Sequence, residues 1–200
     1  MPRPLVRAEI RAFARAVGVD LSEVRDPLDS FYSLQDFFSR ALREGVRTID
    51  PSADSLASPC DGAFGESGIV RDGQLLQVKG RPYGLAELLG SPSDAPRFEG
   101  GGFATLYLSP RDYHRFHAPC AARVERTAYV PGTLWPVNRI GLEGVDGLFA
   151  QNERICAYLR SVRGDALLCL VAVGATMVGK VRLTFDSLET NLAGARAEQH

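Results

Sequence analysis

Several features are scarce or missing in this sequence, and each absence excludes a class of protein. The 200 residues include four cysteines, none in a Cys-x-x-Cys pair, which argues against a secreted disulfide scaffold. No apolar run approaches the ~20 residues that a membrane-spanning helix needs, and no basic-apolar leader opens the sequence. The formal net charge is −1, so we expect no nucleic-acid partner. These features predict a globular protein of the cytoplasm or of the cytoplasmic membrane face.

The N-terminal segment has the pattern of an amphipathic helix. From Arg3 to Val17, apolar residues recur on one narrow face, arginines recur at every fourth position, and Gly18 is placed to end the helix. Such a helix either lies in a membrane interface or packs on the core of its own protein, and the pattern favours neither. The apolar face consists of Val6, Ile10, Phe13 and Val17, and the arginines are Arg3, Arg7, Arg11 and Arg15.

A second helix and a β-like region follow. Ser33 is placed to cap a helix whose apolar residues continue to Leu42, and Gly45 closes it. From Ile49 onward the pattern becomes β-like, and Asp72-Gly73 is the preferred dipeptide of a two-residue hairpin turn.

The order of the predicted elements indicates the fold class. Helices do not alternate regularly with strands, which argues against a Rossmann or barrel layout. We therefore predict an α+β fold in which N-terminal amphipathic helices precede a mostly antiparallel β-sheet or sandwich. The predicted strands are 67–71, 74–78, 103–108, 123–129, 155–159, 166–173 and 178–185, with a short helix at 85–89 and a loop at 91–102.

The most informative feature of the sequence is a pair of histidines three residues apart. His114 and His117 are two of the three histidines in the chain. Ser109, Pro110 and Asp112 precede them with the pattern of a helix N-cap, a first-turn proline and an acidic third position. On the helical turn that this pattern predicts, both imidazoles share a face and point into one pocket. The ordinary alternative is a pair of surface histidines or satisfied core histidines.

Further segments combine turns with polar side chains. Asp61 lies in a Pro-x-Asp-Gly turn, where a carboxylate can orient a histidine, although a lone turn aspartate usually has no such role. Pro131-Gly132 has the signature of a type II turn. Glu153-Arg154 precedes a strand, and these two residues are predicted to form a local ion pair. Gly174 and Gly179 bracket the end of an apolar strand, which indicates close approach of another chain segment or of a substrate.

Taken together and in this order, these segments resemble the phosphatidylserine decarboxylase family. The segment Asp112-Tyr113-His114-Arg115-x-His117 is specific, whereas any one of the others alone is a weak signal. The resemblance spans nearly the whole chain. The other matching segments are Phe37-Phe38-Ser39-Arg40, Ser58-Pro59-Cys60-Asp61-Gly62, Lys79-Gly80 with Tyr83, Tyr107-Leu108-Ser109-Pro110-Arg111, Pro131-Gly132, Phe149 with Asn152-Glu153-Arg154, and Val173-Gly174-Ala175-Thr176.

The resemblance implies a particular chemistry. Members of this family are proenzymes that cut themselves before a serine in a Gly-Ser-Thr or Gly-Ser-Ser segment, and that serine becomes a pyruvoyl group on the small chain. The pyruvoyl group reacts with the amine of phosphatidylserine and takes up the electron pair when carbon dioxide leaves, which yields phosphatidylethanolamine. By the match, Asp61 would orient His117, and His117 would take the proton of the serine hydroxyl during self-cleavage. His114 would serve decarboxylation by donating a proton to the carbanion.

The sequence departs from the family pattern in one respect, because it contains neither Gly-Ser-Thr nor Gly-Ser-Ser. Leu89-Gly90-Ser91 precedes the histidines and is followed by Pro92, so we reject it as the cleavage site. We expect this chain to be the large-chain portion of the proenzyme, inactive without the small chain. Residues 1–48 would be a helical, membrane-facing segment, and residues 49–200 a β-rich catalytic domain that is incomplete at its C-terminus.

The resemblance also implies partners and a location. The expected partners are the pyruvoyl-bearing small chain, phosphatidylserine and a membrane surface, and a homodimer stays open as a further assembly. We expect a peripheral protein on the cytoplasmic side of the cell membrane, with no metal ion.

Two other functions stay open from the residues themselves. A zinc-dependent hydrolase could use His114, His117 and Asp61 as ligands, with Cys60 or Cys120, although the familiar zinc-binding helix spaces its histidines four apart. A non-catalytic barrel-sandwich binding module would need one modified lysine or histidine on an exposed turn, whereas this chain has two clustered histidines. Metal analysis would separate the first alternative from the decarboxylase, and a Gly-Ser-Thr or Gly-Ser-Ser in an extended reading frame would settle the family.

Overall fold

The chain folds into two compact units and passes between them three times. Unit 1 comprises Met1–Phe64 and Leu106–Cys120, and unit 2 comprises Gly65–Thr105 and Ala121–His200. This division follows contacts between residues, whereas the predicted division into a membrane-facing segment and a catalytic domain concerns function and stays a prediction. The structure, a computed structural model, describes residues 2–52, 54–77, 81–192 and 196–200.

The N-terminal helix packs on the core of unit 1. Helix α1, Arg3–Val17, forms over the predicted range and ends at Gly18, whose φ of 84° is left-handed. Val6 and Ile10 on its apolar face are 1% and 0% exposed, whereas Phe13 and Val17 are partly buried, and contact of this helix with a membrane stays a prediction. Neither α1 nor any other helix among the described residues has the length and hydropathy to cross a membrane. The buried cluster formed with this face also contains Val24, Phe31 and Phe37.

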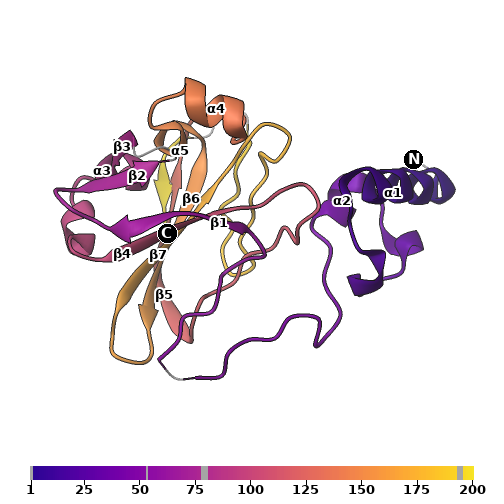
Figure 1. Cartoon of the computed structure of the whole chain (residues 1–200), viewed down its shortest axis with the longest axis horizontal. Coiled ribbons are helices and arrows are strands. Elements are labelled where there is room, and N and C mark those ends of the chain that lie inside the picture. Colours follow the sequence, from indigo (N-terminus) through magenta and orange to yellow (C-terminus); the bar gives the residue numbers. More distant parts are fainter. Residues whose placement is uncertain (1, 53, 78–80, 193–195) are drawn as a thin grey trace. The chain divides into compact units, whose positions relative to one another are not determined.

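Helix α2 packs beside α1 (Figure 1) and is shorter than predicted. It covers only Leu34–Phe38, with Ser33 as its cap, as predicted. Beyond it the chain is extended, because the backbone N–H of Arg25 donates to the carbonyl oxygen of Ala41 and residues 24 and 42 form an isolated β-bridge. These bonds to the preceding segment replace the helical ones, so the prediction of a helix to Leu42 is wrong. Two short 3₁₀ helices, η1 (Leu21–Glu23) and η2 (Leu28–Ser30), connect α1 to α2.

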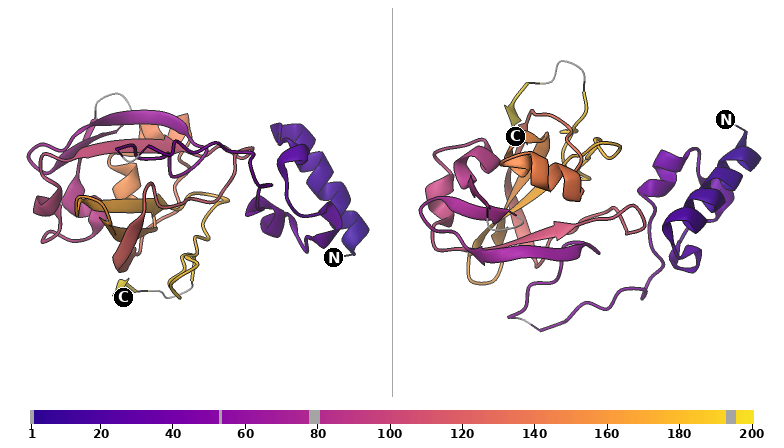
Figure 2. Two further views of the ribbon diagram at one scale, coloured as in Figure 1. Left: turned by 90° about the horizontal axis from the view of Figure 1, so that it is seen from below. Right: turned by 45° about the horizontal axis from the view of Figure 1, so that its top comes forward.

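The β-structure is mostly antiparallel, which confirms the predicted α+β class. Its largest sheet has three long strands side by side (Figure 1), and a two-residue strand completes it. Outside this sheet, strands β1 and β4 form a pair and run side by side in both views of Figure 2. The four-stranded sheet has the order β7 (Leu167–Val173), β6 (Arg154–Ser161), β5 (Ala122–Val130) and β8 (Glu198–Gln199); the pairs are β1 (Ala63–Ile69) with β4 (Gly102–Tyr107), and β2 (Gln74–Gln77) with β3 (Arg81–Gly84).

The predicted turn at Asp72-Gly73 forms, with φ angles of 53° and 65°. These positive angles suit the two-residue turn that this dipeptide favours. The strands on either side pair mainly with other partners, since β1 pairs with β4 and β2 pairs with β3. The end of the predicted strand 74–78 and the matching dipeptide Lys79-Gly80 lie outside the described residues.

Four helices lie in the described part of unit 2. They are α3 (Leu85–Leu89, as predicted), the 3₁₀ helix η4 (Ala95–Phe98) within the predicted loop 91–102, α4 (Arg139–Gly144) and α5 (Leu148–Gln151).

The predicted strand at 178–185 is wrong. Within the described residues this segment makes only isolated bridges, 175 with 178 and 182 with 189. It folds back on itself, because the N–H of Val181 donates to the hydroxyl of Thr190 and the N–H of Thr190 donates to the carbonyl of Val181. Two apolar side chains of this segment, Val181 and Leu183, pack against the buried cluster that contains Tyr129 and Ile155.

A buried polar junction joins β6 to its neighbours in unit 2. Asn152 is 0% exposed, and its amide nitrogen donates to the carbonyl oxygens of Trp135 and Gly174 at 2.8 and 2.9 Å. Glu153 and Arg154 do not form the predicted ion pair. The Glu153 carboxylate accepts from the Tyr129 hydroxyl, and the Arg154 guanidinium donates to three carbonyl oxygens. These acceptors belong to Glu87, Leu88 and Asn152.

Position 132 needs a glycine because another chain segment lies close to its Cα, and not because its φ is left-handed. Its φ is not in the left-handed region, so the predicted type II turn is wrong. A Cβ at this position would lie 2.3 Å from the carbonyl oxygen of Gln151. The backbone is held that close because the N–H of Thr133 donates to the same oxygen. Gly174 and Gly179 confirm the predicted close approach, since a Cβ at either would lie 3.0 Å or less from Leu134.

We predict that Gly132→Ala destabilises the protein by about 2–3 kcal/mol, the usual cost of forcing extra atoms into a packed site. Gly144→Ala is the matched control, because its Cβ would meet nothing within 4 Å at the end of α4. Denaturant unfolding measures both variants. Equal midpoints for the two alanine variants would contradict the account of Gly132.

Candidate functional site

The histidine segment, residues 112–117 of unit 1, is irregular and not helical. The backbone N–H of Asp112 donates to the carbonyl of Ser109 at 2.9 Å, which closes a single turn. The Asp112 carboxylate accepts from both the N–H and the hydroxyl of Ser109, at 2.6 and 2.7 Å. The acidic side chain reaches back to the N–H of Ser109 as in a capping box, but no helix follows, and residues 113–118 have no regular structure. The predicted helical turn is wrong, and the two imidazoles have different surroundings.

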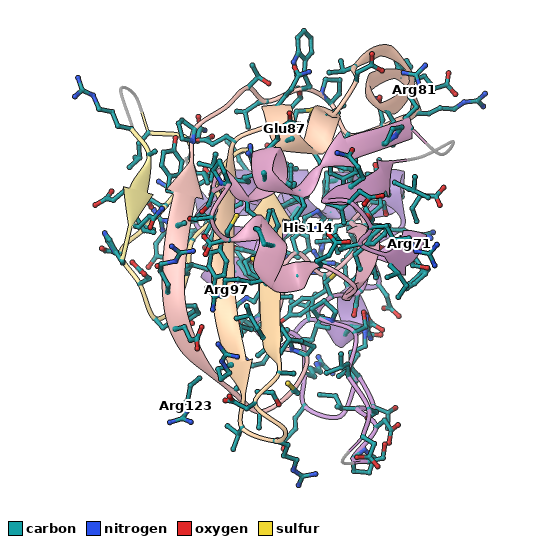
Figure 3. The ribbon with its side chains drawn as sticks, turned by 90° about the vertical axis from the view of Figure 1, so that its left-hand side faces the viewer. Arg71, Arg81, Glu87, Arg97, His114 and Arg123 are labelled. Carbon is teal, nitrogen blue, oxygen red and sulfur yellow. The ribbon has the colours of Figure 1, made fainter. Side chains whose placement is uncertain are left out.

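His114, labelled in Figure 3, is half-buried against an aromatic ring. Its Nδ1 lies 2.9 Å from the carbonyl oxygen of Asp112, and its ring centroid lies 3.9 Å from that of Phe38. A carbonyl oxygen only accepts, so Nδ1 carries the hydrogen and Nε2 holds the lone pair in the neutral ring. Burial lowers the pKa of His114, and the positive charge of Arg40 lowers it further. The ring is therefore neutral near pH 7, with Nε2 ready to take up a proton.

His117 is exposed, and one of its ring nitrogens is free. Its Nε2 lies 3.1 Å from the hydroxyl of Tyr113, and the two rings stack with centroids 5.7 Å apart. The backbone N–H of His117 donates to the carbonyl of Pro59 at 2.8 Å, which brings this segment beside the Pro-x-Asp-Gly turn. Within the described part of the chain, Nδ1 of His117 has no hydrogen-bond partner.

Asp61 accepts hydrogen bonds from an arginine and not from His117. Both bonds come from Arg47 and end on the same carboxylate oxygen, Oδ2, at 2.9 and 2.6 Å. Arg47 also pairs with Glu23, and hydrogen bonds to the two carboxylates raise its pKa. Among the described residues Oδ1 of Asp61 has no hydrogen-bond partner. The structure thus brings Asp61 and His117 onto neighbouring segments, each with one free atom suited to the other.

Arg40 is a residue of this site to which sequence reasoning gave no role. It is 4% exposed, its Nη2 donates to the carbonyls of Arg111 and Asp112, and its Nε and Nη1 are buried without partners among the described residues. Burial lowers the pKa of Arg40, although an arginine stays charged. The signal in the sequence was the position of Arg40 at the end of the matching segment Phe37-Phe38-Ser39-Arg40.

The cysteines add no ligand set to the histidines. Burial raises the pKa of the Cys60 thiol, which keeps it protonated near neutral pH. Among the residues that the structure describes, no three histidine, cysteine, aspartate or glutamate side chains come together as a metal site. The zinc hydrolase alternative therefore gains no support from the geometry.

Comparisons with known proteins identify the relatives of this chain. The family model described as phosphatidylserine decarboxylase matches residues 34–197. A protein of Anaeromyxobacter sp. (strain K) named phosphatidylserine decarboxylase proenzyme is 49% identical over 100% of this chain and 70% of its own length. Proteins of the same name from Brevibacillus brevis and Myxococcus xanthus are 40% and 39% identical, each over 96% of this chain and over 69% and 68% of their own lengths. These matches give no support to the zinc hydrolase or the binding module.

Proposed function

Because this chain belongs to the phosphatidylserine decarboxylase family, we propose that it is the large-chain portion of a proenzyme that converts phosphatidylserine into phosphatidylethanolamine and carbon dioxide. The observation that carries this proposal is the histidine segment, in which a neutral, half-buried His114 lies three residues from an exposed His117 beside the turn of Asp61. The small chain of the same precursor would be its partner. The two histidines would serve two different steps.

We assign His117 and Asp61 to self-cleavage of the precursor. Nδ1 of His117 and Oδ1 of Asp61 are both free, so a rotation of the ring could join them while Arg47 keeps Oδ2. Nε2 would then take the proton of the serine hydroxyl as that oxygen attacks the preceding carbonyl carbon. In the structure the hydroxyl of Tyr113 lies within hydrogen-bond distance of this nitrogen, at the place where the serine hydroxyl would lie.

We assign His114 to proton transfer during decarboxylation. In its neutral form Nε2 can accept a proton from the substrate ammonium group and later return a proton to the carbon that has lost its carboxyl group. This refines the simpler expectation of a proton donor, because the lowered pKa makes the resting ring a base. The half-buried position beside Phe38 limits the access of water to that proton.

The residues present fit a pyruvoyl group carried by the small chain. Such a group is uncharged at its carbonyls and needs no counter-ion, only a nearby side chain that exchanges protons near neutral pH. His114 and His117 each have one ring nitrogen without a partner among the described residues. When present, the group supplies the carbonyl that takes up the electron pair as carbon dioxide leaves.

We predict that His117→Ala and Asp61→Asn leave the full precursor largely uncut, because the hydroxyl then lacks its base or the base lacks its orienting carboxylate. The measurement is the ratio of one to two bands on a denaturing gel, with mass spectrometry of the small chain to detect the new N-terminal pyruvoyl group. Cys60→Ser is the matched control, since it changes the residue next to Asp61 without touching a proposed role. Normal cleavage of both variants would contradict the assignment.

We also propose that the protein is peripheral to the cell membrane on its cytoplasmic side, since its lipid substrate lies in a bilayer. Val6 and Ile10 at the centre of the apolar face of α1 are buried, so we propose that the contact is mainly electrostatic. Arg11 and Arg15 are exposed and have no side-chain partner among the described residues, whereas Arg7 pairs with Asp29 at 3.1 Å. These two free arginines on α1 are the groups that can meet anionic headgroups.

We predict that the double variant Arg11→Gln, Arg15→Gln binds anionic vesicles about thirtyfold more weakly, because each basic residue near such a surface contributes on the order of 1 kcal/mol. Co-sedimentation at low and high salt measures this. The control is Arg123→Gln with Arg163→Gln, which removes the same charge from exposed positions of unit 2, where Arg123 points outward at the end of β5 (Figure 3). Equal weakening in both double variants would contradict a specific role for α1.

A further inference from the structure

We propose that Arg40 is a positioning residue that fixes the tautomer and orientation of His114 through the carbonyl oxygen of Asp112. The inference rests on the proposed function in one respect, namely that His114 serves decarboxylation. The structural part of the inference stands on the contacts of Arg40 alone and can be tested without activity.

The burial of Arg40 calls for a reason other than stability. Its side chain is 4% exposed, and two of its three guanidinium nitrogens have no hydrogen-bond partner in the part of the chain that the structure describes. A buried charge with unpaired donors costs free energy, and a well-packed apolar side chain of similar size is often at least as stable. The one nitrogen that does form hydrogen bonds, Nη2, donates to the carbonyls of Asp112, the first residue of the histidine segment, and of Arg111 just before it.

The contacts of Nη2 explain how Arg40 acts on His114. Nη2 donates to the carbonyl oxygens of Arg111 and Asp112 at 2.9 and 3.2 Å. The Asp112 oxygen also accepts from Nδ1 of His114 at 2.9 Å, so one carbonyl serves both side chains through its two lone pairs. Two neighbouring carbonyls held by one guanidinium cannot rotate independently. Without Arg40 the Asp112 carbonyl is free to turn away, and the ring can flip and present Nδ1 in place of Nε2.

The segment that carries Arg40 also supplies the other surroundings of His114. The ring of Phe38 lies 3.9 Å from that of His114, and the guanidinium of Arg40 lies 5.1 Å over the ring of Phe37. The charged groups that act on the imidazole are Arg40 and Asp112. Burial lowers the pKa of His114 most, the hydrogen bond to the Asp112 carbonyl raises it, the Arg40 charge lowers it further, and the Asp112 charge raises it. The same residue that orients the ring therefore also favours its neutral form.

A second arginine bridges the same two segments without touching the Asp112 carbonyl, which makes it a matched control. Nε of Arg115 donates to the carbonyl oxygen of Ser39 at 2.8 Å. If Arg40 merely braced the two segments, loss of either bridge would have the same effect. If Arg40 acts through the Asp112 carbonyl, loss of the Arg115 bridge leaves His114 unchanged.

The test is a ¹⁵N NMR titration of the histidines, of which the chain has three. In the wild type we expect His114 to hold its hydrogen on Nδ1 and to titrate below the ordinary histidine value. Arg40→Met should give a mixture of tautomers because the Asp112 carbonyl is no longer held, Arg40→Lys should keep more of the Nδ1–H form because its ammonium group still donates a hydrogen bond, and Arg115→Met should match the wild type. Arg40→Gln serves where circular dichroism shows that Arg40→Met is unfolded. An unchanged tautomer in Arg40→Met or Arg40→Gln, or an equal change in Arg115→Met, would overturn the proposal.

Activity of the processed two-chain enzyme gives a second readout. Arg40→Met should lower kcat by about tenfold to a hundredfold with little change in KM, as part of the roughly 10²–10⁴-fold that a positioned acid–base group contributes. Arg115→Met should keep the wild-type kcat, because it leaves the contacts of the Asp112 carbonyl intact. An equal loss of kcat in Arg40→Met and Arg115→Met would contradict the proposal. If the wild type released no carbon dioxide, the proposed function would fail, and the titration would still decide the role of Arg40.

Discussion

The carbonyl oxygen of Asp112 is the point on which the candidate site depends, because Arg40 and His114 both donate to it. Through this oxygen the helical N-terminal part of unit 1 sets the state of a histidine more than seventy residues later in the chain. Hydrogen bonds from a charged donor are stronger than neutral ones, and low-dielectric surroundings strengthen them further. The N-terminal helices are therefore part of the chemical site, as well as the part of the chain that we propose meets a membrane.

Unit 2 uses the same device for its own framework. The buried Arg154 donates only to backbone carbonyls, as Arg40 does, and it ties the start of β6 to helix α3. Asn152 beside it satisfies the backbone of the neighbouring segments with both ends of its amide. In both units a buried polar side chain fixes irregular backbone, which an apolar core cannot do because it has no directional bonds. The two arginines differ in how many of their guanidinium nitrogens form hydrogen bonds. Each nitrogen of Arg154 donates one, whereas two nitrogens of Arg40 have no partner among the described residues.

Local signals in the sequence predicted the elements that local interactions decide. The periodicity and the glycine stop of α1, the short helix α3 and the turn at Asp72-Gly73 all form as expected. At Ala41 the prediction failed because a distant segment competes for the backbone: its carbonyl accepts from Arg25 instead of continuing a helix. The predicted strand at 178–185 failed because the segment folds back on itself through Val181 and Thr190. The candidate site follows the same division. Its histidines and Asp61 were identified from motifs, but the bond from Arg47 to Asp61 and the role of Arg40 depend on contacts that no spacing in the sequence encodes.

The central claim is that a neutral His114 moves the protons of decarboxylation while self-cleavage depends on other groups. The most direct test is release of labelled carbon dioxide from carboxyl-labelled phosphatidylserine by the processed enzyme, with the wild type and His114→Ala compared at equal amounts of small chain. The account predicts normal processing of His114→Ala and a rate lower by about 10²-fold or more, the usual contribution of a positioned acid–base group. A fully processed variant that releases carbon dioxide at the wild-type rate would contradict it.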